Sequence, residues 1–423
     1  METLDFKSAS FKDFENIPDF DFKATAKYFG SYLDYLENLD YLNYRIESST
    51  GCSPELLLKL PGAEDFSRAC SFVSNDYLGF TQHPEIKMAI IASIAKYGAG
   101  SAASPAIGGH FSYHAQLENK IAQFFKREEA ILYNTGYTAN SATFQCLLKK
   151  EDLAILDMAV HASIYEGCLL TNVKSFPHNN MEMLERVLKN TQGKYRTRMV
   201  IVDGVYSQDG DIAHLKDISY LTKKYNAYLA VDDAHGIGVV GGTGRGVIEL
   251  FNLYNDVDII MGTFSKALGN LGGFIVADPD IIRYLKFQSK QHLFSTTATP
   301  ANMGVIRALE LIDEEPQWRT KLWKNIDYFK KGLLERGYNI GTTYSAVVPL
   351  KVGDIPTTLE LGKRLLQEGV YANSIMYPAV SKKDARIRFN LMATHEFRHF
   401  DKVFEALDKI DNEMGFTKRT ING

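Results

Sequence analysis

Six short apolar runs between residues 70 and 280 constrain the fold of this chain more than any other feature of its sequence. Helical stretches such as Tyr113–Phe125 and Met181–Leu188 alternate with them. Strands buried on both faces have continuous apolar sequences, so the pattern predicts an α/β domain with a mostly parallel sheet. The predicted strands are Ala130–Tyr133, Leu153–Leu156, Met199–Val202, Tyr228–Val231, Asp258–Met261 and Phe274–Ala277.

The remaining sequence predicts two further parts. Residues 1–70 contain an aromatic-rich helix, with apolar positions at helical spacing from Tyr28, and a connector at Gly51–Gly62. This helix is expected to pack on the body or on a partner subunit; peripheral contact with a membrane is the alternative. A large domain spans residues 71–300, and a smaller α+β domain spans residues 301–423. The smaller domain is predicted from the helices Ala301–Glu314, Trp318–Arg336 and Phe400–Ile410 and the strands Ala346–Lys351 and Ile387–Leu391.

Charge and cysteine content exclude several classes of protein. The chain has 47 basic and 51 acidic residues and a formal net charge of -4, which argues against a nucleic-acid partner. Its four cysteines form no CxxC pair, which predicts reduced thiols and neither disulfides nor a metal site. The N-terminus has no apolar segment of a signal peptide, and no apolar run approaches the ~20 residues of a membrane span. A cytoplasmic globular enzyme is therefore expected.

The segment Gly236–Gly241 matches the dinucleotide-binding pattern G-x-G-x-x-G after a predicted strand. That pattern should open a helix, but Gly242, Gly244 and Gly246 follow it, and such glycine density predicts a loop. We therefore reject the dinucleotide-binding interpretation of this segment. A NAD-dependent oxidoreductase is kept only as the disfavoured alternative from another enzyme class.

A lysine with phosphate-binding neighbours gives the first chemical signal. Lys266 follows a predicted strand and has hydroxyl side chains beside it at Thr263 and Ser265. Hydroxyl and backbone N–H groups suit a phosphate, and a lysine held among them can form a Schiff base with an aldehyde cofactor. Asp232 ends the preceding strand and can face a pyridinium nitrogen, while His235 can reach the neighbouring phenolate oxygen. These groups predict pyridoxal 5'-phosphate (PLP).

Nine segments, which span residues 70–415, extend this pattern: Ser74–Gly79, Gly98–Glu118, Asn134–Tyr137, His161–Ser163, Asp203–Ser207, Asp232–His235, Thr263–Lys266, Phe294–Thr296 and Ile387–Phe389. In these segments the chain resembles the α-oxoamine synthases, PLP enzymes of fold type I. The resemblance implies a homodimer with composite active sites and a decarboxylating condensation of an amino acid with an acyl thioester. A non-catalytic partner subunit is disfavoured because Lys266 is present.

The resemblance also implies roles for individual residues. Lys266 holds the cofactor and moves the Cα proton, and His161 stacks on the pyridine ring. The phosphate is bound by Gly136, Tyr137, Thr263 and Ser265, and by Thr296 of the neighbouring subunit. The substrate side is assigned Asn75, Tyr77, Ser104 and Arg388, of which Arg388 pairs with the substrate carboxylate.

Three stretches look most like bacterial serine palmitoyltransferases: His178–Met181, Leu322–Tyr328 and Leu391–His395. Pro105 stands where that branch tends to have arginine. The amino acid substrate is therefore left open between serine and cysteate. We therefore predict a long-chain fatty acyl thioester, acyl-CoA or acyl-carrier protein, as the acyl donor. The product is a 3-oxo long-chain base for sphingolipid or sulfonolipid synthesis. An 8-amino-7-oxononanoate synthase, which uses alanine, is the alternative within the family.

Overall fold

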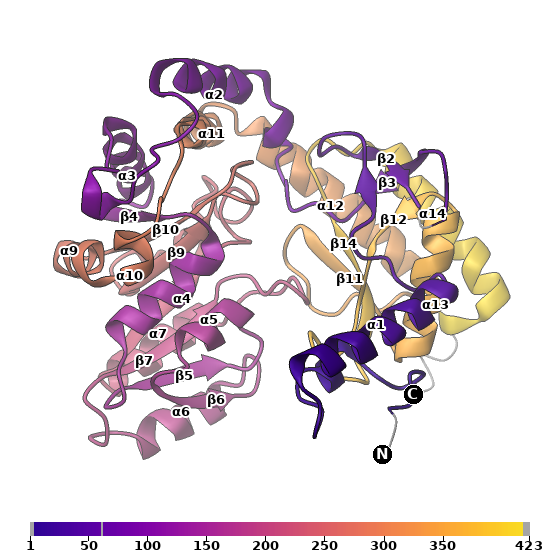
Figure 1. Cartoon of the computed structure of the whole chain (residues 1–423), viewed down its shortest axis with the longest axis horizontal. Helices are drawn as coiled ribbons and strands as arrows, with labels where there is room; N and C mark the ends of the chain where they lie inside the picture. The colour runs from indigo at the N-terminus through magenta and orange to yellow at the C-terminus, as the bar shows by residue number, and fades with distance from the viewer. Residues whose placement is uncertain (1–3, 61, 418–423) are drawn as a thin grey trace. The chain divides into compact units, whose positions relative to one another are not determined.

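The computed structural model describes residues 4–60 and 62–417 and divides into two compact units (Figure 1). The larger unit comprises Asn75–Trp323 and Tyr344–Ala346. The smaller unit comprises the described residues of Met1–Ser74, Lys324–Thr343 and Val347–Gly423. This division differs from the expected boundaries at residues 70 and 300.

Two sets of contacts explain the difference. Helix α11 (Met303–Glu314) packs against α2 (Pro84–Tyr97) and α3 (Ser112–Phe124), which keeps it in the larger unit. Strand β3 (Ser67–Ser71) pairs in parallel with β12 (Val370–Tyr371), which joins the N-terminal segment to the C-terminal elements.

The larger unit is built on a seven-stranded sheet in the order β4-β10-β9-β8-β7-β5-β6, in which only β10 runs antiparallel to its neighbours. The predicted mostly parallel sheet is confirmed, and all six predicted runs are strands. The sequence analysis missed β6, a mostly exposed strand at the sheet edge. The strands are β4 (Glu129–Tyr133), β5 (Leu153–Asp157), β6 (Asn172–Phe176), β7 (Arg198–Asp203), β8 (Tyr228–Asp232), β9 (Ile259–Thr263) and β10 (Gly273–Ala277).

Helix α4 (Gly136–Leu147) lies against β4, β9 and β10 (Figure 1). Because parallel strands end at the same sheet edge, Asp157, Asp203, Asp232 and Thr263 are brought to one side of the larger unit. The other helices of this unit are α5 (Ala162–Gly167), α6 (Met181–Asn190), α7 (Leu215–Lys224), α8 (Val247–Phe251), α9 (Pro279–Gln288) and α10 (Lys290–Leu293), with 3-10 turns at Phe80–Gln82, Pro105–Ile107 and Pro300–Asn302.

The glycine-rich stretch after β8 is a loop, as expected, and packing around a buried carboxylate explains its composition. Asp233 is fully buried and accepts a hydrogen bond from the Val247 amide at 2.6 Å. A Cβ atom at Gly204, Gly236 or Gly246 would lie 2.5, 2.0 or 1.8 Å from an oxygen of the Asp233 carboxylate. Gly246 also has a φ of +84°, which L side chains rarely adopt. The glycines thus allow backbone to surround Asp233.

The smaller unit has two sheets, ordered β1-β2-β3-β12 and β11-β14-β13. The predicted connector at Gly51–Gly62 is wrong in part, because β2 (Glu55–Lys59) pairs there with β3. The other elements are β1 (Glu47–Ser48), β11 (Val347–Gly353), β13 (Asn373–Ile375), β14 (Ala385–Asn390), α12 (Gln317–Glu335, which has residues in both units), α13 (Ile355–Gln367) and α14 (Phe397–Met414).

The aromatic N-terminal segment forms a small cluster of its own. A 3-10 turn at Phe11–Phe14 precedes helix α1 (Phe22–Asn38). Phe14, the last residue of this turn, stacks on Tyr32 of α1 with ring centroids 4.9 Å apart. Beyond α1, Asp40 pairs with Lys363 of α13 at 3.2 Å. The segment therefore contacts α13 within the smaller unit, while packing of α1 on a partner subunit and contact with a membrane stay predictions. Within residues 4–60 and 62–417, no helix has the length and apolar character needed to cross a membrane.

Candidate active site

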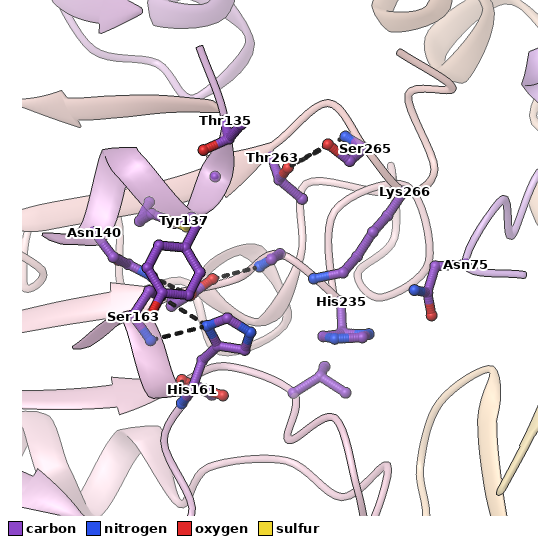
Figure 2. Close-up of a pocket in the computed structure, with 16 residues that line it drawn as sticks. Asn75, Thr135, Tyr137, Asn140, His161, Ser163, His235, Thr263, Ser265 and Lys266 are labelled. Carbon is purple, nitrogen blue, oxygen red and sulfur yellow. Dashed lines mark hydrogen bonds between the residues drawn. The ribbon is translucent and has the colours of Figure 1, made fainter. Parts of the chain in front are cut away.

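A cavity of about 260 Å³ lies at the carboxyl ends of the sheet strands in the larger unit (Figure 2). Nine of the predicted site residues line it: Asn75, Gly136, Tyr137, His161, Asp232, His235, Thr263, Ser265 and Lys266. Figure 2 shows the Lys266 side chain pointing from its loop into this pocket. The remaining lining residues are Thr135, Asn140, Ser163, Asp203, Val205, Ala234 and Met261.

The two phosphate-binding stretches predicted from the sequence form one cup. Helix α4 begins at Gly136, with Thr135 as its cap, and its N-terminal amides are suited to an anion. A Cβ at Gly136 would lie 2.8 Å from the Thr263 side chain, so glycine permits the close approach of α4 to β9. The Thr263 hydroxyl donates to the Gly272 carbonyl at 2.9 Å and lies 3.3 Å from Ser265 Oγ, which places two hydroxyl groups at the same cup.

Two donors orient the Asp232 carboxylate in the pocket. Asn140 Nδ2 donates to Asp232 Oδ2 at 2.7 Å, and the Ala234 amide donates to Asp232 Oδ1 at 3.0 Å. Asp232 lines the cavity but is only 6% exposed, so its carboxylate has little contact with bulk solvent. Asn140 lies one helical turn after Gly136, a spacing that places both residues on the same face of α4.

His161 is held in place through Ser163. Its Nδ1 lies 2.8 Å from Ser163 Oγ, which in turn accepts from Asn140 Nδ2 at 3.0 Å. Burial lowers the pKa of His161; Asp232 opposes this shift and Lys266 adds to it. A neutral imidazole in this position suits stacking against an aromatic ring. The Tyr137 ring makes an edge-on contact with the His161 imidazole, with ring centroids 5.9 Å apart (Figure 2). This contact further restricts the orientation of the imidazole.

Tyr77, expected on the substrate side with Asn75, lies beside the pocket, and its role toward substrate stays a prediction. It is completely buried and does not line the pocket, whereas Asn75 does. The Tyr77 hydroxyl lies 2.6 Å from His235 Nδ1 and donates to Asn75 Oδ1 at 3.2 Å. Tyr77 is therefore in contact with His235, which lines the pocket.

Besides Tyr77, three further predicted residues do not line the pocket. Thr296 is exposed, and its hydroxyl donates to the Ala103 carbonyl at 3.3 Å. Ser104 precedes the 3-10 turn that begins at Pro105. Arg388 belongs to the smaller unit, in the middle of β14 and opposite Pro349 of β11. The roles of these three residues stay predictions.

Sequence reasoning did not assign roles to Asn140, Ser163 and Asp203. Asp203 ends β7 and is 3% exposed; burial, together with the charge of Asp232, raises its pKa well above the ordinary value. It accepts a hydrogen bond from the His161 amide at 3.4 Å. Two of these residues lie inside segments that carried the family resemblance, and the spacing from Gly136 was the signal for Asn140.

Comparisons with known proteins agree with this geometry. The family model for aminotransferase class I and II matches residues 69–407. The 8-amino-7-oxononanoate synthase of Thermoanaerobacter pseudethanolicus is 38% identical over 390 residues, which are 90% of this chain and 98% of that protein. The serine palmitoyltransferase of Sphingobacterium spiritivorum is 38% identical over 349 residues, 82% of this chain and 87% of that one. A solved structure of serine palmitoyltransferase (SPT) with a PLP internal aldimine has a TM-score of 0.86 at 28% identity, and the match covers 92% of this chain and 99% of that one.

Proposed function

Because this chain belongs to the aminotransferase class I and II family and, within it, to the α-oxoamine synthases, we propose that it condenses serine or cysteate with a long-chain fatty acyl thioester. The general reaction is the PLP-dependent one of the family. The Cα–H bond of the amino acid breaks and a new carbon–carbon bond joins Cα to the acyl carbon, while the carbon–sulfur bond breaks and the thiolate leaves and takes up a proton. The amino acid carboxylate departs as carbon dioxide, and a proton returns to Cα to give the 3-oxo amine.

The observation that carries this proposal is the convergence of a lysine, a buried carboxylate and a single phosphate cup in one pocket. The close approach at Gly136 leaves backbone amides and hydroxyls free of side-chain bulk, which fits the PLP phosphate. Bound PLP supplies an electron sink for negative charge that develops at Cα. Lys266 is assigned to hold the cofactor and to move the Cα proton, and Asp232 to face the ring nitrogen. His161 is assigned to one face of the ring.

Two features support the long-chain assignment. The stretches around residues 322–328 and 391–395 that resemble serine palmitoyltransferases meet in the smaller unit, where Asn325 Nδ2 donates to the carbonyls of Met392 and His395 at 2.9 and 3.0 Å. The aromatic N-terminal segment adds apolar surface, including Phe22, which is 80% exposed. The relative from Thermoanaerobacter pseudethanolicus favours the alternative, an 8-amino-7-oxononanoate synthase that takes alanine.

Carbon dioxide release tests the substrate assignment. Purified holoenzyme is given serine, cysteate or alanine, each with a long-chain acyl thioester or a short dicarboxylic acyl thioester. We expect release with serine or cysteate and the long-chain donor, which would also identify the amino acid. Release only with alanine and the dicarboxylic donor would transfer the protein to the 8-amino-7-oxononanoate branch.

We propose a homodimer, because the larger unit exposes apolar side chains that a partner would bury. Met88 and Ile91 form an exposed stripe on α2, with 62% and 66% exposure. Ile107 and Phe294 are 77% and 69% exposed, and the turn that contains Ile107 contacts α10. In the proposed dimer, Thr296 reaches the cofactor phosphate of the neighbouring subunit.

Solution mass tests the dimer. The wild-type protein is expected to have the mass of two chains, and Ile91→Glu with Ile107→Glu to yield monomer with most of its activity lost, because buried charges disfavour an apolar interface. Lys331→Glu, on the exposed side of α12, serves as a surface-charge control. A fully active wild-type monomer would contradict the proposal.

A further inference from the structure

We propose that His178 is a positioning residue of the pocket, an imidazolium cation that ties the turn before His161 to the loop after β7. His178 belongs neither to the phosphate cup nor to the loop of Lys266. It lies in His178–Met181, one of the stretches that look most like bacterial serine palmitoyltransferases. The inference rests on the proposed PLP chemistry of the pocket but not on which amino acid or acyl donor is used.

Both ring nitrogens of His178 face carboxylates. Nδ1 lies 3.1 Å from Asp157 Oδ1, and Nε2 lies 2.9 Å from Asp211 Oδ2. A carboxylate only accepts hydrogen bonds, so an imidazole between two of them must donate from both nitrogens, which requires the protonated form. The Asp157 side chain is fully buried and that of Asp211 is 12% exposed, so neither charge is well solvated.

The electrostatic surroundings favour this cation. Burial lowers the pKa of His178, but hydrogen bonds and charges from Asp157 and Asp211 outweigh burial and raise the pKa to about 10. Asp157 comes from β5, and Asp211 from the loop after β7; Tyr206 of the same loop packs edge-on against the ring at 4.3 Å. Removing the cation would leave a buried carboxylate without its counter-charge, which is strongly unfavourable.

The cation is connected to the pocket on two sides. On one side, Asp157 Oδ1 also accepts from the Ala159 amide at 2.8 Å, in the turn that leads to His161. On the other side, the Asp211 carbonyl accepts from the Tyr206 amide at 3.0 Å, next to Val205, which lines the pocket. His178 thus fixes the relative positions of the turn before His161 and the loop after β7, although it does not itself line the pocket.

Asn179, the next residue, makes a second connection between the same two segments. The Asn179 amide donates to Asp157 Oδ2 at 2.9 Å, and Asn179 Nδ2 donates to the Ile212 carbonyl at 3.1 Å. Asn179 adopts a φ of +51°, the left-handed conformation that asparagine tolerates better than most residues. His178 and Asn179 therefore bridge the same two segments, through a charge and through an amide.

The protonation state can be measured directly. In nitrogen-15 spectra of histidine-labelled protein, the His178 ring is expected to be doubly protonated from pH 6 to pH 9, and the signal is assigned by its loss in His178→Gln. A singly protonated ring at pH 8 would overturn the proposal. This measurement needs neither substrate nor turnover, so its failure is distinct from failure of the proposed function.

PLP binding to the apoprotein tests the positioning role. His178→Gln is expected to weaken PLP affinity by at least about tenfold, because the wall that carries His161 loses its anchor. Adding Asp211→Asn to His178→Gln removes one unpaired charge and should recover part of that loss. The exposed His214→Gln is the matched control and should bind PLP as the wild type does. Unchanged PLP affinity in folded His178→Gln would overturn the positioning role.

The pH dependence of thermal unfolding gives an independent readout. Because the pKa of His178 is raised on folding, its stabilising effect is present in full below the ordinary value of about 6.5 and is lost as the pH rises through about 10. The difference in Tm between the wild type and His178→Gln should therefore shrink from pH 6 toward pH 10. A difference that is constant over this range would contradict a charged His178.

Discussion

Lys266→Ala is expected to abolish turnover, with a loss of at least about 10³-fold in kcat. The substitution removes both the amine assigned to hold PLP and the base assigned to move the Cα proton. The hydroxyls of Thr263 and Ser265 and the α4 N-terminus remain, so PLP should still bind, but without a covalent bond to the protein. Initial rates and the dialysis resistance of bound PLP measure the two effects separately.

Chemical labelling identifies the lysine independently of activity. Borohydride reduction of the native holoenzyme, followed by peptide mapping, should place the cofactor on Lys266. Lys224→Ala is a matched control, because Lys224 pairs with Glu185 on the surface at 2.6 Å and lies outside the pocket. A label on any other lysine would show that Lys266 does not hold PLP and would contradict the proposed mechanism.

The core strands could be predicted because strands that are buried on both faces have continuous apolar sequences. Strand β8 illustrates this, since four of its five residues are buried. Strand β6 is exposed at four of five positions, and its sequence therefore has no continuous apolar run. The boundary expected at residue 300 differs from the division of the structure for another reason. Which neighbours α11 contacts is a property of the tertiary structure, and its sequence shows only that it is an amphipathic helix.

The site was predictable where a residue type has few alternative uses. Asp232 ends the buried strand β8 and Lys266 follows the buried strand β9, and the structure places both in the same pocket. Tyr77 lies in a recognisable segment, but whether its side chain faces substrate or His235 depends on packing that one sequence does not encode visibly. The His178 cation was missed because Asp157 and Asp211, its partners, are 21 and 33 residues away.

Asp232→Asn is expected to lower kcat by about 10²- to 10³-fold, the range for removal of one electrostatic group from an active site. The charge assigned to the cofactor ring nitrogen is lost. The amide introduced at position 232 can still accept from the Ala234 N–H group, but its NH₂ group then faces the NH₂ group of Asn140. The single substitution therefore combines loss of charge with loss of a hydrogen bond.

The exchange variant Asp232→Asn with Asn140→Asp separates these two causes. It restores a donor–acceptor pair across the 2.7 Å contact and keeps the net charge of the pocket, but moves the carboxylate onto α4. We expect the exchange to recover most of the Tm lost in Asp232→Asn while kcat stays low, because the ring nitrogen needs a negative charge at the end of β8. Ser163, which already bonds Asn140, can donate to the relocated carboxylate, so the fold should tolerate the change. Recovery of wild-type kcat in the exchange variant would show that the hydrogen bond, and not the position of the charge, is what this site requires.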